Sequence, residues 1–325
     1  METRAAGRSG LRLSRLGLGC ATFGREISQD ESFRIMDYAV AHGITLFDTA
    51  EAYGGGQARE YRRKVLGVDD QREVSGEMHS SEKIIGRWLA SRGGRRQITL
   101  LTKVTSQFTR AHVREALEAS LERLRTDAVD LYLYHSFDPR TPVEEAAAAM
   151  DEVVAAGLAR AGGCSNYTGA QLDEALTTAE NHGLNRFEVV ETAYSLVARQ
   201  METDLLPVCR RRQVGILTYS PLAAGFLLGK YRPGAPLPPG TRFDVIPGHR
   251  DVYFSERNFA IAGRLARMAE RTGRSAALLA MAWVLRQPDV ASVLVGARTT
   301  AHLDNALEAL RAGLPDDWAA EMEAW

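Results

Sequence analysis

The chain has 325 residues, of which 45% are hydrophobic, and its 40 basic residues are balanced by 41 acidic ones. This composition can fill a large core, which excludes general disorder, and the charge balance argues against non-specific binding to nucleic acid or an anionic membrane. The three cysteines, Cys20, Cys164 and Cys209, have no metal-type spacing and do not form a disulfide framework. Met1–Gly10 holds no apolar run, and no stretch reaches about 18 apolar residues, so we expect a cytoplasmic protein without a signal peptide or membrane span.

Short apolar runs alternate with amphipathic segments along the chain, which is the pattern of repeated β-α units and a parallel sheet. The predicted strands are Arg15–Cys20, Ile44–Asp48, Ile98–Lys103, Val129–Tyr134, Arg160–Cys164, Val189–Glu191, Gly215–Tyr219 and Ser292–Val295. Eight such runs favour an α/β fold of the (β/α)8 TIM-barrel type over an open sheet, and a single domain spanning residues 1–325.

The segments between the strands have helical period. From Ala111 onward the apolar residues of one helix face are Val113, Ala116, Leu117, Leu121 and Leu124. Thr168 and Gln171 predict a capping box at the start of another helix, and Gly43 and Gly183 are placed as C-terminal caps.

Two segments lack this periodicity. Pro233–Gly248 is dense in proline and glycine and is predicted to be a long loop, as is the glycine run Gly54–Gly56. Gln57–His79 is charged and poorly periodic, so we expect an insertion at about residues 57–79 that lies over one face of the domain.

Polar residues interrupt the predicted strands at their carboxyl ends, and these residues are Asp48, Lys103, His135, Ser165, Asn166, Glu191 and Ser220. All strands of a parallel barrel end at one mouth, where active sites lie, so these side chains should converge there. Each has a simpler explanation by itself: Lys103 and His135 as solvated strand-edge residues, and Asp48 as a turn residue. Their placement together at the strand ends favours an active site at the barrel mouth.

The chemistry that such a set supports is specific. A tyrosine with a pKa near about 10 is a poor acid at neutral pH, and a buried ammonium beside it lowers that pKa. Asp48 is expected to hold the Lys103 ammonium in place, and Tyr53 is then expected to give a proton to a carbonyl oxygen that His135 orients. Hydride transfer itself needs a cofactor, because no side chain carries hydride.

Several short motifs occur in a fixed order along the chain. They are Leu16-Gly-Leu-Gly-Cys20, Phe47-Asp-Thr-Ala-Glu-Ala-Tyr53-Gly54, Ser81-Glu82 with Ile85-Gly86, Leu101-Thr-Lys103, Asp130-Leu-Tyr-Leu-Tyr-His135, Gly163-Cys-Ser-Asn-Tyr167, Tyr219-Ser-Pro-Leu222 with Gly229-Lys230-Tyr231, and Val295-Gly-Ala-Arg298. In these motifs the chain resembles the aldo-keto reductase superfamily over nearly its whole length.

The resemblance implies a TIM barrel with an N-terminal β-hairpin and extra loops and helices at the barrel mouth. It implies a catalytic tetrad of Asp48, Tyr53, Lys103 and His135, with Tyr53 as the general acid and base. It also implies NADP(H) as the cofactor, bound across the mouth without a Rossmann fold, and the sequence has no Gly-x-Gly-x-x-Gly motif. No histidine or cysteine pair has metal-ligand spacing, so no metal is expected.

The resemblance also implies the cofactor contacts. Beside the nicotinamide they are Cys20, Ala21, Asp48, Ser165, Asn166, Glu191 and Tyr219; along the pyrophosphate they are Ser220, Pro221, Leu222, Gly225 and Lys230; around the adenosine 2′-phosphate they are Gly296, Arg298, Thr299, His302 and Asn305. Glu191 stands where the family usually has glutamine, so one amide donor is missing. Arg298 is the expected phosphate partner and Arg242 a second candidate, with solvated surface charge as the alternative for both.

In the family, only a handful of residues commonly separate the catalytic tyrosine from the Ser-Glu pair that opens the next helix. Here Ser81 lies 28 positions after Tyr53, so the insertion departs from that pattern. Its charged residues include Arg59, Arg62, Arg63, Lys64, Asp69, Asp70, Arg72 and Glu73. The arginine-rich Arg59–Lys64 run suggests contact with a polar, phosphorylated or nucleotide-linked substrate, and a solvated excursion or an oligomer contact are the alternatives.

The leading functional hypothesis is therefore an enzyme that reduces an aldehyde, ketone or sugar carbonyl to an alcohol, or catalyses the reverse reaction. The expected partner is a small molecule, with sugars and nucleotide-sugars as a guess, and a homo-oligomer is compatible with the sequence. The alternative is a cofactor-sensing binding subunit with little turnover. A third class, a barrel isomerase or metal-dependent hydrolase, is disfavoured by the cofactor-like segments and the lack of a metal motif.

Overall fold

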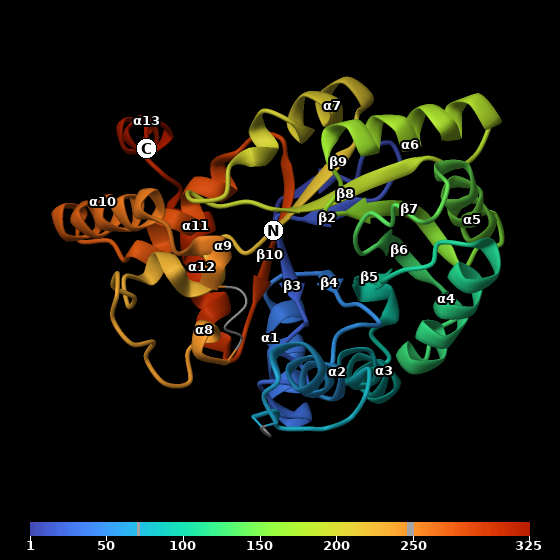
Figure 1. Cartoon of the computed structure of the whole chain (residues 1–325), viewed down its shortest axis with the longest axis horizontal. Coiled ribbons are helices and arrows are strands. Elements are labelled where there is room, and N and C mark those ends of the chain that lie inside the picture. Colours follow the sequence, from blue (N-terminus) through green and yellow to red (C-terminus); the bar gives the residue numbers. More distant parts are fainter. Residues whose placement is uncertain (70–71, 246–249) are drawn as a thin grey trace.

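Eight parallel strands close into a barrel in the computed structural model, which describes residues 1–69, 72–245 and 250–325 (Figure 1). In the order of the barrel they are β3 (Leu16–Gly19), β4 (Leu46–Asp48), β5 (Thr99–Val104), β6 (Val129–Tyr134), β7 (Ala159–Ser165), β8 (Phe187–Ala193), β9 (Gly215–Tyr219) and β10 (Val290–Gly296), which pairs back to β3. Each of them overlaps one predicted strand, so the TIM-barrel prediction is confirmed. All residues of β6 are buried, as expected for a strand covered on both sides.

An antiparallel hairpin of β1 (Thr3–Ala5) and β2 (Arg12–Ser14) closes the amino-terminal end of the barrel. Its turn lies so close to the start of β9 that a Cβ on Gly215 would lie 2.7 Å from the Gly7 nitrogen. Hairpin and barrel share one apolar cluster, made of Ala6, Leu11, Leu13, Leu46, Leu101, Leu131, Leu133, Ala161, Val189, Leu217, Ala291 and Leu294. Because these side chains fill the interior, the barrel is a packed core with one open end.

Helices surround the strands (Figure 1). They are α1 (Gln29–Ala41), α2 (Gly55–Tyr61), the π-helix η1 (Arg62–Leu66), α3 (Ser80–Arg92), η2 (Arg95–Gln97), α4 (Arg110–Leu124), α5 (Val143–Ala155), α6 (Gly169–His182), η3 (Gln200–Glu202), α7 (Leu205–Arg212), η4 (Ala223–Leu228), α8 (Arg242–Val245), α9 (Arg250–Tyr253), α10 (Glu256–Thr272), α11 (Ala276–Arg286), α12 (Thr300–Ala312) and α13 (Asp316–Glu323). The predicted apolar face of α4 is buried, and α6 has the predicted capping box and ends at Gly183. No helix in the described ranges is long and apolar enough to cross a membrane.

The predicted loops are partly helical, which corrects two expectations. Gly54 is the N-cap of α2, and Gly55 and Gly56 lie in its first turn. A Cβ on Gly55 would lie 1.8 Å from the Ser75 oxygen, so only glycine fits at that position. The insertion continues from α2 into η1, so its first part is helical. Pro233–Gly248 contains α8, and residues 246–248 lie outside the described residues.

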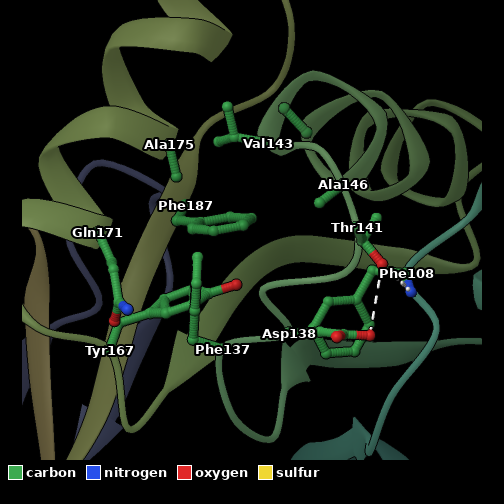
Figure 2. A pocket seen from close by; sticks show the side chains of 11 residues that line it. Phe108, Phe137, Asp138, Thr141, Val143, Ala146, Tyr167, Gln171, Ala175 and Phe187 are labelled. Atoms are coloured by element: carbon green, nitrogen blue, oxygen red, sulfur yellow. Dashed lines mark hydrogen bonds between the residues drawn. The ribbon is translucent and has the colours of Figure 1, made fainter.

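A small cavity of about 10 Å³ lies between the barrel and helices α5 and α6 (Figure 2). The rings of Phe137, Tyr167 and Phe187 face one another across it, and Thr141 donates a hydrogen bond to Asp138 at its edge. A space of this size holds about one water molecule, so it is a packing defect of the outer layer.

Candidate active site

Lys103, at the end of β5, is the centre of the buried charges at the barrel mouth. Its ammonium donates a hydrogen bond to Asp48 at the end of β4, and a second to the Thr49 carbonyl at 3.2 Å. The ammonium also lies 3.2 Å from Oε2 of Glu191 in β8. The side chains of Lys103, Asp48 and Glu191 are only 0%, 6% and 3% exposed. Three adjoining ionisable groups, two carboxyl groups and one ammonium, are therefore held out of water.

Tyr53 and His135 lie beside this group. The Lys103 ammonium is 5.1 Å from the centre of the Tyr53 ring, and that ring meets the His135 ring edge-to-face with centroids 5.4 Å apart. The His135 peptide N–H donates to the Val104 carbonyl at 2.8 Å, which fixes the residue to the end of β5. Its buried Nδ1 atom has no hydrogen-bond partner among the described residues. Burial, helped by Lys103, lowers the pKa of His135 to about 3, so the ring is neutral.

The pKa of Tyr53 depends on more groups than Lys103 alone. Burial raises the pKa of its hydroxyl above the usual value; Lys103 lowers it, but Asp48 and Glu191 raise it. Lys103 lowers the pKa of Tyr53 in the predicted direction, but burial and the two carboxylates outweigh it, so the pKa is raised overall. Tyr53 is a neutral phenol at physiological pH.

The residues expected to hold the nicotinamide carboxamide form one hydrogen-bonded chain. The Asn166 amide donates to the His135 carbonyl at 2.9 Å and to Ser165 Oγ at 3.1 Å, and it accepts a bond of 2.7 Å from the Tyr219 hydroxyl. Glu191 pairs with Ser165 across β7 and β8. These four residues lie on adjacent strand ends, as the barrel order requires.

The loop after β9 has an unusual backbone. Ser220, Ala223 and Ala224 have φ angles of 55°, 50° and 54°, and Gly225 has 86°. Left-handed backbone at residues other than glycine costs about 1–3 kcal/mol each and is concentrated at ligand-binding sites. A Cβ on Gly225 would lie 3.4 Å from the Lys230 amine, so the absence of a side chain leaves the backbone open beside a cation.

Cations gather at the far end of that loop. Arg25 and Arg242 donate hydrogen bonds to Glu26 at 2.7 and 2.8 Å, and Arg298 lies 3.9 Å from the same carboxylate. Burial lowers the pKa of Arg242 to about 10, and burial and Arg298 lower the pKa of Lys230. The Lys230 amine therefore lies close enough to Arg298 for the two positive charges to repel each other.

Arg25 and Glu26 were missed by the sequence reasoning, although they lie in the segment between β3 and α1 at the barrel mouth. Both residues lie a few positions after a predicted strand, which could have marked them as mouth residues. Only residues directly at the strand ends were considered as candidates.

The remaining expected contacts are near the start of α12. Thr299 is its N-cap, and Thr299 Oγ1 lies 3.1 Å from His302 Nδ1. Gly296 faces open space, with no atom within 4 Å of an added Cβ, and Asn305 lies one turn beyond His302. At the other side, burial raises the pKa of the Cys20 thiol, which makes it unreactive.

Two arginines of the insertion at residues 57–79 are paired with carboxylates. Arg62 is buried and paired with Glu73, with side chains 4% and 3% exposed, and Arg72 pairs with Asp244 of α8 at 3.3 Å. Its exposed large apolar side chains are Tyr61, Val65, Val68, Val74 and Met78. Asp70, one of its predicted charged residues, lies outside the described residues.

The model of the Aldo/keto reductase family matches residues 15–325. The chain is 33% identical to the uncharacterized oxidoreductase YrpG of Bacillus subtilis, over 97% of this chain and 92% of that protein. It is 33% identical to the protein Tas of Escherichia coli, over 100% of this chain and 97% of that one. A probable voltage-gated potassium channel subunit beta of Arabidopsis thaliana is 31% identical, over 95% and 91%. On this evidence the chain is an oxidoreductase that belongs to the aldo/keto reductase family.

Proposed function

We propose that this chain uses NADP(H) to reduce an aldehyde, ketone or sugar carbonyl to an alcohol, or to catalyse the reverse reaction, with Tyr53 as the general acid and base. The observation that carries the proposal is that the Tyr53 ring is in contact with both the Lys103 ammonium and the neutral His135 ring. The nicotinamide supplies the hydride when bound.

Each residue of the tetrad then has one task. Tyr53, which keeps its proton at neutral pH, donates it to the oxygen of the carbonyl that is being reduced. Lys103 stabilises the phenolate that forms, and Asp48 holds the Lys103 ammonium in place. His135, whose Nδ1 already lacks a partner, orients the carbonyl oxygen through its ring.

The cofactor is proposed to lie across the mouth from Glu191 to Arg298. An orphaned buried oxygen on Glu191 and the open faces at Gly225 and Gly296 suit such a ligand. The cations at Lys230 and Arg298 suit its phosphates, and a guanidinium pairs with a 2′-phosphate by two parallel hydrogen bonds. Ser165, Asn166 and Glu191 are proposed to bind the carboxamide and Tyr219 to stack on the ring.

The substrate class stays a hypothesis. Arg59 and Arg63 are the residues proposed to contact a phosphorylated, sugar or nucleotide-sugar substrate, because Arg62 is paired with Glu73 in the interior of the insertion. We further propose a reducing cytoplasmic location, where Cys20, Cys164 and Cys209 stay free thiols.

The test is oxidation of NADPH with a panel of aldehydes, ketones and sugars. The substitution Tyr53→Phe should lower kcat by about 10²- to 10⁴-fold, the usual contribution of a positioned acid, while the Kd for NADPH stays unchanged. Wild-type turnover by Tyr53→Phe would overturn the assignment. Tight NADPH binding without turnover on any carbonyl would favour the alternative, a cofactor-sensing subunit, which the similarity to a probable channel subunit suggests.

A further inference from the structure

Glu191 is a second carboxyl group beside Lys103, in addition to Asp48, which already binds the Lys103 ammonium. The Lys103 ammonium has three hydrogens, and two are donated to Asp48 and the Thr49 carbonyl. Its 3.2 Å contact with Glu191 has the distance of an ion pair but not the geometry of a hydrogen bond, so Oε2 of Glu191 is buried without a hydrogen-bond partner among the described residues. Glu191 is therefore the weaker held of the two carboxylates.

The local charge decides which carboxylate carries a proton. With both ionised, the buried group would have a net charge of −1, and an uncompensated buried charge is costly enough that a group takes up a proton instead. Burial and the Asp48 carboxylate raise the pKa of Glu191 to about 8, against the opposing effect of Lys103. Near neutral pH Glu191 is thus a carboxylic acid, which has one O–H donor and one carbonyl acceptor, like the side chain of glutamine.

No other charge faces Glu191 among the described residues. Tyr53 and Tyr219 are neutral phenols, because burial raises the pKa of both, that of Tyr219 to about 12. His135 is neutral, and Ser165 on the adjoining strand has no charge. The next charge to enter the site would come from the ligand.

We propose that Glu191 releases its proton when the oxidised nicotinamide dinucleotide binds and keeps it when the reduced one binds, so that alkaline pH shifts the preference toward the oxidised cofactor. This inference rests on the proposed function, which places the ring beside Glu191 and Tyr219. The oxidised ring carries a positive charge that favours the Glu191 carboxylate, whereas the reduced ring is neutral and does not. The released proton goes to the solvent, and no bond other than the O–H of Glu191 is broken.

Linkage gives the expected size. Each unit by which the oxidised cofactor lowers the pKa of Glu191 corresponds to about a tenfold change in the ratio of the two dissociation constants. A shift of about one to two units predicts that the ratio of the Kd for NADPH to that for NADP⁺ rises about 10- to 100-fold between a pH of about 6 and about 9.

The experiment measures binding of NADP⁺ and of NADPH to the wild type, E191Q and E188Q by isothermal titration calorimetry across that pH range. Buffers of different ionisation enthalpy give the number of protons released. The 2′-phosphate also titrates near a pH of about 6, but both dinucleotides carry it, so the difference between them isolates Glu191. Glu188 is the matched control, because it lies on the same strand at the opposite end, where it accepts a hydrogen bond from the Arg8 peptide.

The wild type and E188Q are expected to release up to one proton more with NADP⁺ than with NADPH, and E191Q to release equal numbers and to show a Kd ratio independent of pH. Equal proton counts in the wild type overturn the inference, whatever the variants do, and leave the proposed function standing. An unequal count that persists in E191Q also overturns it. Failure of the wild type to bind either dinucleotide overturns the proposed function and the inference together.

Discussion

Replacing Lys103 by methionine should make the stability of the protein strongly dependent on pH. The substitution keeps the volume but leaves Asp48 and Glu191 buried without their shared cation. Removing one partner from a buried ion pair costs about 3–5 kcal/mol. The pKa values of the two carboxylates determine how much of that loss appears at a given pH.

In wild type, burial already raises the pKa of Asp48, and Lys103 opposes this increase. Without Lys103 the folded-state pKa of Asp48 rises further above its unfolded value of about 3.9. A raised pKa contributes stability at low pH that is lost as the pH increases toward that pKa, at about 1.4 kcal/mol for each pH unit. Glu191 stays protonated in the folded state of both proteins across this range, so its contribution is the same in both and only Asp48 changes the difference between them.

We therefore expect the free energy of unfolding of Lys103→Met to fall short of wild type by about 3 kcal/mol more at a pH of about 7.5 than at about 5.5. Urea unfolding followed by tryptophan fluorescence measures this difference. The double variant D48N/K103M is the control, since it has no acid at position 48 and should lose the extra pH dependence. A loss of stability that is the same at both pH values would refute the reasoning.

Three further outcomes are expected. Arg298→Ala should raise the Kd for NADPH about tenfold or more and leave that for NADH unchanged, because a charge-assisted hydrogen bond is worth about 1.5–3 kcal/mol; equal losses for both cofactors would contradict a 2′-phosphate contact. Arg62→Met should lower stability by about 3–5 kcal/mol and expose the insertion to limited proteolysis, with R62M/E73L recovering much of the loss; an unaffected R62M would contradict a structural role for the pair. The variant R59A/R63A should raise KM for phosphorylated aldehydes but not for neutral ones, and parallel changes would remove the hypothesis of an anionic substrate.

The barrel was predictable because its strands are short apolar runs with polar residues at their ends. The strand that ends at Asp48 and the strand that ends at Lys103 are adjacent in sequence and in the barrel, so convergence of their side chains followed from topology. Sequence could not give the electrostatic balance, because the effect of Glu191 on Tyr53 depends on burial and on distances across the barrel.

Local structure was misjudged where residue type and context conflict. Glycine disfavours helices, yet Gly55 and Gly56 begin α2 because the backbone of Ser75 and Gly76 leaves no room for side chains there. The Arg62 side chain was taken as available to a ligand because a charge normally faces solvent, and its partner Glu73 is far enough along the chain that the pairing leaves no periodic signal.

The hairpin of β1 and β2 determines at which end of the barrel a label or tag can be attached without blocking the mouth. Since it covers the floor opposite the mouth, a chemical label or affinity tag joined to Met1 would leave the mouth clear. A surface-immobilised form attached through its first residue should thus present every molecule with its reactive end outward.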